Sequence, residues 1–316
     1  MNPMKQFILV RLLQTIPVLI GITFIAFLLM MVTPGDPAEI NLRAMMNTDF
    51  PPKEAVAIMR EQMDLDKPWY IQYFSWLSRV LKGDLGYSYQ TRKSTTDEIL
   101  RAFPVTFLLS SIAMLFSIII AIPIGILAGI HPNGRLDHLS RAISIIGLSI
   151  PDFFLGILDI LIFSITLKIL PVAGYKGPEY LILPAFALSI SLFAVTMRLM
   201  RTSMAEELEQ EYITTAISKG LDRGTIIRRH ALKNAIVPVL TYMGTQYGWL
   251  FGGAMIIESL FALPGMGRLF VDAAASRDIM VMQACIMVFA IIFIIINLCI
   301  DISYYLLDPR MRDTHE

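Results

Sequence analysis

Charged residues are scarce in this 316-residue sequence. Only 16% of its residues are Asp, Glu, Lys or Arg, whereas 55% are hydrophobic. Soluble globular domains carry about 25% charged residues. The deficit comes with long uncharged runs, which exclude an ordinary soluble domain and indicate an all-α polytopic membrane protein. Because 26 basic and 26 acidic residues cancel, electrostatic information lies in how the charges are distributed.

Cysteine is almost missing as well. Cys285 and Cys299 fall in one apolar run, and fourteen residues of helix would separate them by about 21 Å. That distance excludes a disulfide between them. We therefore expect two buried thiols that act as small hydrophobic side chains, and the spacing predicts no metal site.

Familiar catalytic motifs are also lacking. The sequence contains no G-x-x-x-x-G-K-[ST], no H-E-x-x-H and no G-x-S-x-G, so nothing indicates ATP binding, zinc-dependent proteolysis or a serine nucleophile. No catalytic residue is predicted on these grounds.

Six apolar runs are long enough to cross a bilayer as helices. The first is too long for the core of a signal peptide, and no cleavage-type site follows it, so we expect a retained helix. The predicted spans are Leu12–Val32, Phe103–Ile130, Ile143–Leu170, Leu181–Met200, Ile236–Ile257 and Met282–Leu307.

Basic residues predict the orientation of these spans. With the N-terminus inside, the inside segments hold thirteen Lys and Arg residues and the two short outside loops hold four. The positive-inside rule then places both termini in the cytoplasm. Residues 1–32 form the first helix, 33–100 an extracytoplasmic segment, 101–308 the core, and 309–316 a cytoplasmic tail.

Two outer stretches carry local signals. Aromatic residues recur at helical spacing from Trp69 to Trp76; they predict a helix that either lies on the membrane surface or packs against the outer ends of the spans. After the fifth span, Pro264, Gly265 and Gly267 should break any helix. We expect either a loop that dips into a membrane pathway or faces an external partner, or a re-entrant packing element.

Proline and glycine also mark positions inside the spans. Pro151 predicts a break or kink in the third span, which is either a packing feature or a bend around a transport path. Gly244, Gly248 and Gly252 are four residues apart and form a strip that lets another helix approach closely. The strip either packs within one subunit or lines a subunit interface or pore.

Two aspartates lie within predicted spans, where carboxylates are costly and often functional. Asp159 and Asp301 are the only candidates for an intramembrane aspartyl enzyme, but their surroundings lack the glycine-flanked motif of such enzymes. The alternative is an intramembrane polar network in which Asp301 joins Asn297 and an arginine at the inner end of the fourth span, Arg198 or Arg201.

The densest basic segment lies in the cytoplasmic loop 201–235. A predicted helix there, with Asp222 as the N-cap of the next, presents one face of apolar and small residues. Such a helix suits a groove in another protein; the alternative is a loop that its positive charge retains inside. The face comprises Tyr212, Ile213, Ala216, Ile217, Gly220 and Leu221.

This segment resembles the coupling ("EAA") loop of ATP-binding-cassette (ABC) importer permeases, whose pattern is E-A-A, three residues, Gly, nine residues and I-x-L-P. Glu211 stands at the glutamate, Ala216 in the small-residue slot and Gly220 at the glycine, whereas His230 to Lys233 replace I-x-L-P. With "SIPDFFLG", "GGAMIIESLFALPGMGRLFVDA" and "NLCIDISYYLLDPRMR", the whole chain is similar to the dipeptide/oligopeptide/nickel branch.

The resemblance implies a type I permease fold that forms half of a translocation pathway in a prokaryotic inner membrane. Implied partners are a second similar permease, in a heterodimer more than a homodimer, two ATPase subunits that bind ATP and Mg²⁺, and an external solute-binding protein. This chain itself would bind no cofactor and no nucleic acid. The implied ATPase contacts are Glu211, Tyr212, Ala216, Gly220 and Leu221.

The substrate is not readable from the residues. The branch implies small peptides, and nickel, a metal chelate or metallophore, glutathione or an opine stay open. A stand-alone secondary transporter would be expected to show internal repeats, and the two halves of this sequence show none.

Overall fold

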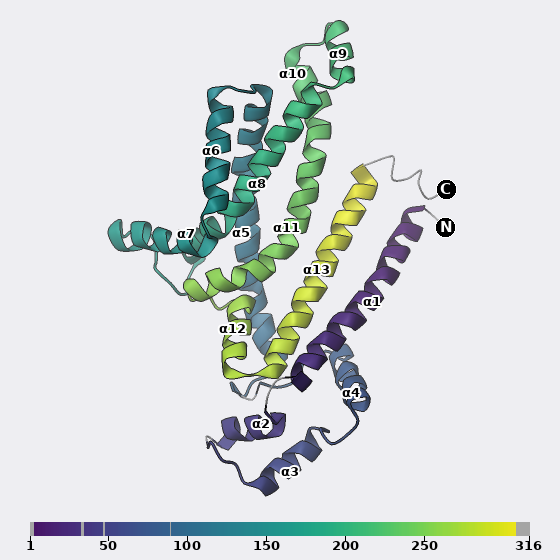
Figure 1. Cartoon of the computed structure of the whole chain (residues 1–316), viewed down its shortest axis with the longest axis vertical. Coiled ribbons are helices and arrows are strands. Elements are labelled where there is room, and N and C mark those ends of the chain that lie inside the picture. Colours follow the sequence, from purple (N-terminus) through teal and green to yellow (C-terminus); the bar gives the residue numbers. More distant parts are fainter. Residues whose placement is uncertain (1–2, 33–34, 47, 89, 308–316) are drawn as a thin grey trace. The chain divides into compact units, whose positions relative to one another are not determined.

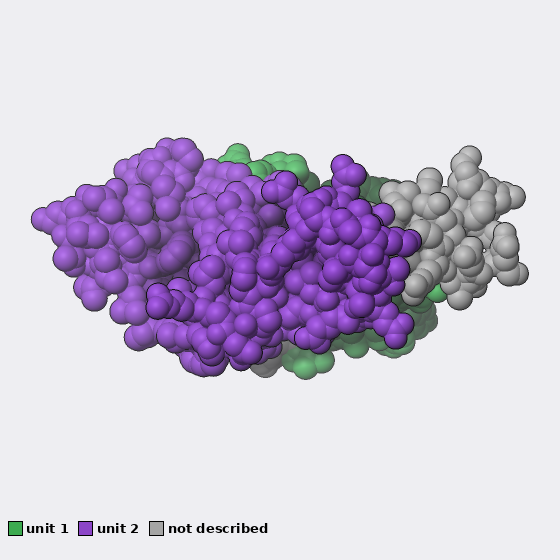
Figure 2. All heavy atoms as spheres, turned by 90° about the horizontal axis from the view of Figure 1, so that it is seen from above, with its two compact units in different colours: residues 1–105, 264–316 green, residues 106–263 purple. Residues whose placement is uncertain are grey.

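Helices dominate the computed structural model, which describes residues 3–32, 35–46, 48–88 and 90–307 (Figure 1). No β-sheet occurs within these ranges, where an isolated bridge pairs Tyr87 with Ser94. The chain divides into two compact units, residues 1–105 with 264–316 (unit 1) and residues 106–263 (unit 2), which are coloured in Figure 2.

Unit 1 is built around two long helices, α1 and α13, that pack side by side in opposite directions. Gln283 donates a hydrogen bond to the carbonyl of Ala26 (2.9 Å) near one end of the pair. Arg11 forms an ion pair with Asp301 (3.3 Å) near the other. The helices of unit 1 are α1 (Pro3–Val32), α2 (Pro37–Met46), α3 (Lys53–Gln62), α4 (Trp69–Leu81), the start of α5 (Thr95–Ile130), α12 (Met266–Ser276) and α13 (Ile279–Leu307).

The predicted aromatic helix is α4, and it packs against the end of α1. The rings of Phe24 and Phe27 lie 5.7 and 5.5 Å from that of Tyr73, whose hydroxyl is 3.0 Å from that of Thr23. Of the two expectations for this helix, packing against a span is therefore confirmed for its buried side. Trp69, Tyr70 and Phe74 remain exposed.

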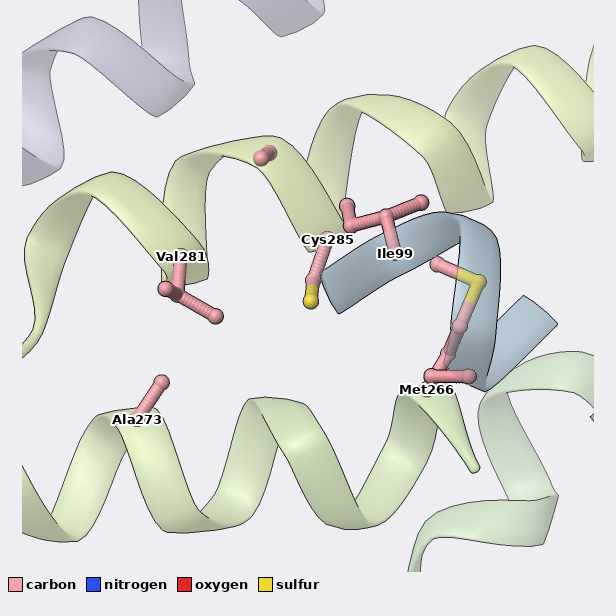
Figure 3. Close-up of a cluster of buried hydrophobic side chains, with 7 residues drawn as sticks. Ile99, Met266, Ala273, Val281 and Cys285 are labelled. Carbon is pink, nitrogen blue, oxygen red and sulfur yellow. The ribbon is translucent and has the colours of Figure 1, made fainter. Parts of the chain in front are cut away.

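A second apolar cluster of unit 1 joins the start of α5 to α12 and α13. Ile99, Met266, Val281 and Cys285 are buried in it, and Figure 3 shows side chains from the three helices converging there. The expectation of two buried thiols holds for Cys285 and is wrong for Cys299, which is exposed. The sequence pattern did not reveal which side of the apolar helix α13 Cys299 occupies.

The stretch from Pro264 to Gly267 corrects another expectation. Gly265 is the N-cap of α12, and Gly267 lies buried inside that helix rather than breaking it. One glycine costs a helix only about 1 kcal/mol, which packing of the turn around Met266 offsets. Of these four residues, Pro264 and Gly265 lie outside a helix.

Unit 2 contains the remaining helices. In it α8 packs against α6, α7 and α11. The helices of unit 2 are the rest of α5, α6 (Arg135–Ser149), α7 (Asp152–Asp159), the π-helix η1 (Ile160–Thr166), the 3₁₀ turn η2 (Pro178–Leu181), α8 (Ile182–Leu208), α9 (Glu211–Ser218), α10 (Arg223–Thr225), the π-helix η3 (Ile226–Ala231) and α11 (Leu232–Leu260).

The predicted break at Pro151 is confirmed. Helix α6 ends at Ser149 and α7 begins at Asp152, and the segment Arg135–Ser149 meets the segment Asp152–Thr166 at 98°. The third predicted span is therefore two segments joined at a corner rather than one straight helix.

Two glycines allow α5 to approach α8 closely. A Cβ added at Gly125 would lie 2.7 Å from Cβ of Met200, and one at Gly129 would lie 2.7 Å from the carbonyl of Arg201. Residue numbers rise together along both helices, so α5 and α8 run parallel. Glycine is needed at both positions because any side chain would separate the helices.

Among the described residues, four helices are long and apolar enough to cross a membrane, or five if the bent pair counts as one span. The four are Ile8–Leu28, Thr95–Ile130, Pro178–Leu208 and Ile279–Ile302. Helix α11 has 29 residues but is not among them. Its stretch "TYMGTQYGW" places polar and small residues in the predicted fifth span.

Candidate functional site

A short helix, α9, lies at the ends of α8 and α11 in unit 2 (Figure 1). Ile213 and Ala216 face inward, with 2% and 7% of their surface exposed, whereas Glu211, Tyr212 and Leu221 are exposed. The small residue Ala216 therefore allows close packing within the chain. The expected ATPase contact at Ala216 stays a prediction.

Gly220 ends α9 in a left-handed backbone conformation, with φ at +79°. Its N–H donates to the carbonyl of Ile217 (2.9 Å), and the N–H of Leu221 donates to that of Ala216 (3.3 Å). This bond pattern is the Schellman motif, which favours glycine because it has no Cβ to clash. Gly220 thus lies beyond the helix, and a Cβ there would meet no atom within 4 Å.

Asp222 begins the next helical segment, as predicted. Its side chain accepts hydrogen bonds from the backbone N–H and the hydroxyl of Thr225, at 2.8 and 2.6 Å. Because these bonds favour the ionised carboxylate, they lower the pKa of Asp222 below its usual value. The turn between α9 and α10 is therefore capped on both sides, by Gly220 and by Asp222.

A largely apolar cleft of about 460 Å³ lies between α9, η3 and the last turns of α5 and α8. Glu209 and Arg223 contribute its charged groups. Its apolar lining includes Ile130, Leu208, Ile213, Ile217, Leu221, Ile226 and Ile227.

The hydroxyl of Tyr212 connects three helices. It donates to Glu207 on the last turn of α8 (2.5 Å) and accepts from the side-chain amide of Asn234 on the first turn of α11 (3.2 Å). Partial burial, followed by the bond to Glu207, raises the pKa of the Tyr212 phenol. The phenol therefore keeps its proton and remains a donor. Sequence reasoning missed Glu207 and Asn234.

An ion-pair cluster stands near the same end of unit 2. The carboxylate of Asp137 is fully buried and accepts two bonds from Arg201 and two from Arg141, at 2.8 to 3.1 Å. The backbone N–H of Asn133 donates to it as well (2.8 Å). The cluster joins α6 to α8 and gives Arg201 a partner within its own unit.

Comparison with known families decides the class of the protein. Residues 121–313 match the family described as "Binding-protein-dependent transport system inner membrane component", and residues 4–110 match its N-terminal companion family. The chain belongs to this family. It is thus a permease subunit of an ABC importer and a multi-pass protein of the bacterial inner membrane.

Curated relatives agree over almost the full length of the permease. "Glutathione transport system permease protein GsiC" of Escherichia coli strain K12 is 37% identical over 309 residues, covering 98% of this chain and 99% of the relative. The protein of the same name from Salmonella typhimurium is 36% identical over the same length. These matches place the permease in the predicted dipeptide/oligopeptide/nickel branch.

The fold of the permease also resembles a solved transporter. An inward-facing structure of the MetNI methionine ABC transporter matches with a TM-score of 0.57 at 17% identity, covering 67% of this chain and 96% of that one. At this identity the match supports the fold alone.

The three glycines of the predicted strip differ in how deeply they are buried in the permease. Gly248 is buried and Gly244 is half-buried, whereas Gly252 is exposed. A Cβ added at Gly252 would meet no atom within 4 Å. Close packing within the described part of the chain therefore does not require Gly252.

The intramembrane acids of the permease lie in different units. In unit 1, Asp301 pairs with Arg11 of α1, a residue that sequence reasoning overlooked, and Asn297 lines the same cleft of about 260 Å³. This ion pair fits the polar network expected around Asp301 better than an aspartyl dyad.

Within unit 2, Asp159 is buried at the end of α7, and its Oδ2 has no hydrogen-bond partner in the described ranges. Arg198 is exposed on α8 near Tyr242 of α11. The expected pairing of Asp301 with Arg198 or Arg201 is corrected by two observed pairs, Arg11 with Asp301 and Arg201 with Asp137.

Proposed function

We propose that α9 and the turn at Gly220 form the surface through which this permease docks an ATPase subunit. The observation that carries the proposal is that α9 is a short helix, closed at its C-terminal end by the turn at Gly220 and anchored on Ile213 and Ala216, while its other side stays exposed. A rigid exposed helix suits insertion into a groove of another protein. The expected contacts are Glu211, Tyr212, Gly220 and Leu221.

We also propose six spans with both termini in the cytoplasm. The antiparallel pairing of α1 with α13 supports this topology, since the first and last of six spans must run in opposite directions. The parallel course of α5 and α8, the second and fourth spans, supports it as well. Helix α11 is then the fifth span, and residues 33–100 lie outside the cell. The cytoplasmic tail 309–316 lies outside the described residues.

The family is defined by dependence on a binding protein, and an ABC importer uses ATPase subunits. We infer that ATP and Mg²⁺ bind to those subunits, because this sequence contains no phosphate-binding loop. A second, similar permease would complete the pathway as a heterodimer. The exposed glycines Gly252 and Gly253 on α11 would allow a helix of that second permease to approach closely.

For the substrate, we propose glutathione or a peptide of similar size. The support is the name carried by relatives that align over 98% of this chain. Nickel or a metal chelate is the second candidate.

Site-specific crosslinking tests the docking surface. A photo-crosslinking amino acid in place of Ser218, on the exposed side of α9, should capture the ATPase subunit in membranes that express the whole transporter. The same group in place of Phe50, exposed between α2 and α3, is the matched control and should not. If Ser218 captured no ATPase while the intact complex purified normally, α9 would not be the docking surface.

Titration of the solute-binding protein that serves this permease tests the substrate. Glutathione or a short peptide should bind, and a nickel chelate should not. If only the nickel chelate bound tightly, this transporter would instead be assigned to the metal-importing members of the branch.

A further inference from the structure

We infer that Tyr212 is a positioning residue whose hydroxyl makes α9 move together with α8 and α11, so that displacement of α9 reaches both long helices. The inference rests on the proposed docking role of α9. It assigns Tyr212 a task inside the permease in addition to the expected ATPase contact.

The hydroxyl lies where three chain segments meet. Glu207 is five residues before Tyr212, on the last turn of α8, and Asn234 is 22 residues after it, on the first turn of α11. A single side chain therefore connects the end of one long helix with the beginning of the next. Helices α8 and α11 pack against each other, and α9 lies at the end of this packed pair (Figure 1).

The backbone offers a less direct connection between α9 and α11. After α9 the chain passes through Gly220 in a left-handed conformation, the short α10 and the π-helix η3 before α11 begins. Glycine has the greatest conformational freedom of all residues, and π-helical turns are often found where a helix serves a function. The hydroxyl bridges this indirect route with two hydrogen bonds.

On the side of α8 the backbone connection is short, because only two residues separate α8 from α9. The bond to Glu207 limits how far α9 can rotate about this connection, and it is strengthened by the negative charge of the acceptor. The buried Ile213 holds the centre of α9, but an apolar contact has no direction and permits rotation. The hydrogen bonds to Tyr212 are directional and therefore restrict this rotation.

Removal of the Tyr212 hydroxyl should impair the transmission of α9 movement to α8 and α11 without impairing folding. Tyr212 is more than a third exposed, so water can satisfy Glu207 and Asn234 in its absence, and the phenyl ring of a Tyr212→Phe variant keeps its packing. Such a change costs little stability because exposed polar groups that lose a partner rehydrate. What is lost is the fixed geometry between the three helices.

The experiment uses the whole transporter in proteoliposomes, with substrate-loaded binding protein, and measures substrate transported per ATP hydrolysed. Tyr212→Phe should lower this ratio about threefold or more, within the range by which coupling changes in other proteins. Co-purification of the ATPase and the unfolding temperature should stay unchanged. Tyr70→Phe, which removes an exposed phenol from α4, is the matched control and should retain the full ratio.

A double-mutant comparison separates this role from a general weakening of α9. If Glu207 acts through the hydroxyl, Tyr212→Phe combined with Glu207→Ala should be no worse than the more damaging single variant. An unchanged ratio in Tyr212→Phe, or fully additive losses, would overturn the inference. Loss of ATPase co-purification in Tyr212→Phe would also overturn it, because the hydroxyl, and not only the ring that the variant keeps, would then be needed for docking. Failure of the Ser218 crosslink would instead count against the proposed docking surface.

Discussion

Arg201 and Asp137 form a two-bond ion pair inside unit 2: Nε of Arg201 donates to Oδ1 of Asp137, and Nη2 donates to Oδ2, each at 2.8 Å. The carboxylate is fully buried, and the Arg201 side chain is 18% exposed. The pair connects α6 to α8 across 64 residues of sequence, so the relative placement of these helices depends on it.

Loss of this carboxylate should destabilise the permease strongly. Asp137→Ala leaves the half-buried Arg201 without its partner, and breaking a fully buried pair in this way costs about 3–5 kcal/mol, which is the upper limit here. Arg141→Ala removes the more exposed partner and should cost less than about 1 kcal/mol. Thermal unfolding in detergent would compare the two, and equal shifts in Tm would contradict the assignment of Arg201 as the main partner.

The glycines should differ in how they tolerate alanine. Gly125→Ala and Gly129→Ala force α5 away from α8 and should cost about 1–3 kcal/mol each. Gly252→Ala adds a methyl group to open space in a helix and should be neutral or stabilising by up to about 1 kcal/mol in the isolated chain. Unfolding temperatures of the three variants test this order; destabilisation by Gly252→Ala alone would reverse it.

Gly220 should matter for its backbone conformation more than for its size. Gly220→Ala places an L-residue at φ +79°, which costs roughly 1 kcal/mol or more, whereas Asn tolerates this region better. We expect Gly220→Ala to weaken ATPase binding more than Gly220→Asn does, although Asn is larger. Binding of purified ATPase to permease in nanodiscs measures the order, and the opposite result would favour a steric role.

The pair of Arg11 with Asp301 predicts rescue by charge exchange. Arg11→Asp and Asp301→Arg should each lower the unfolding temperature, because each places two like charges together between α1 and α13. The double variant restores an opposite pair and should recover most of the loss. The exposed fractions of 39% and 29% limit the wild-type pair to about 1 kcal/mol. Absence of any recovery would mean that the two side chains do not act as a pair.

Acid should loosen the turn after α9. Because the pKa of Asp222 is lowered in the folded chain, its contribution to the cap is complete above the ordinary carboxylate pKa of about 4. That contribution is lost as pH falls through the lower folded value. A spin label at Ser218 should therefore gain mobility below about pH 4, whereas Asp222→Asn, an N-cap that does not titrate, should remove the transition.

Local signals in the sequence predicted local structure well. Proline at 151 located the corner, and Asp222 was recognised as an N-cap because a short polar side chain before a helix satisfies its first N–H groups. The aromatic residues recurring from Trp69 to Trp76 predicted the helix α4. Each of these inferences depends on residues within a few positions of one another, which is the range over which backbone geometry and spacing act.

Long-range partners were not readable. Arg11 and Asp301 are 290 positions apart, and no spacing rule connects them. The i,i+4 spacing of Asp137 and Arg141 was available as a signal, but nothing indicated that Arg201 completes the cluster. Likewise, the helical face of α9 was predicted, but which side packs on the rest of the chain depends on η3 and the end of α8.

The corner at Pro151 has a consequence for the bilayer around it. The last carbonyls of α6 and the N–H groups of Asp152 and Phe153, which begin α7, have no partner within their own helices, and lipid tails cannot supply one. Since α6 and α7 meet at 98°, these groups need water or another polar surface, so this elbow should be hydrated. A spin label at Phe153 should then collide with a water-soluble relaxing agent more often than one at Ile119, which faces outward on the uninterrupted helix α5.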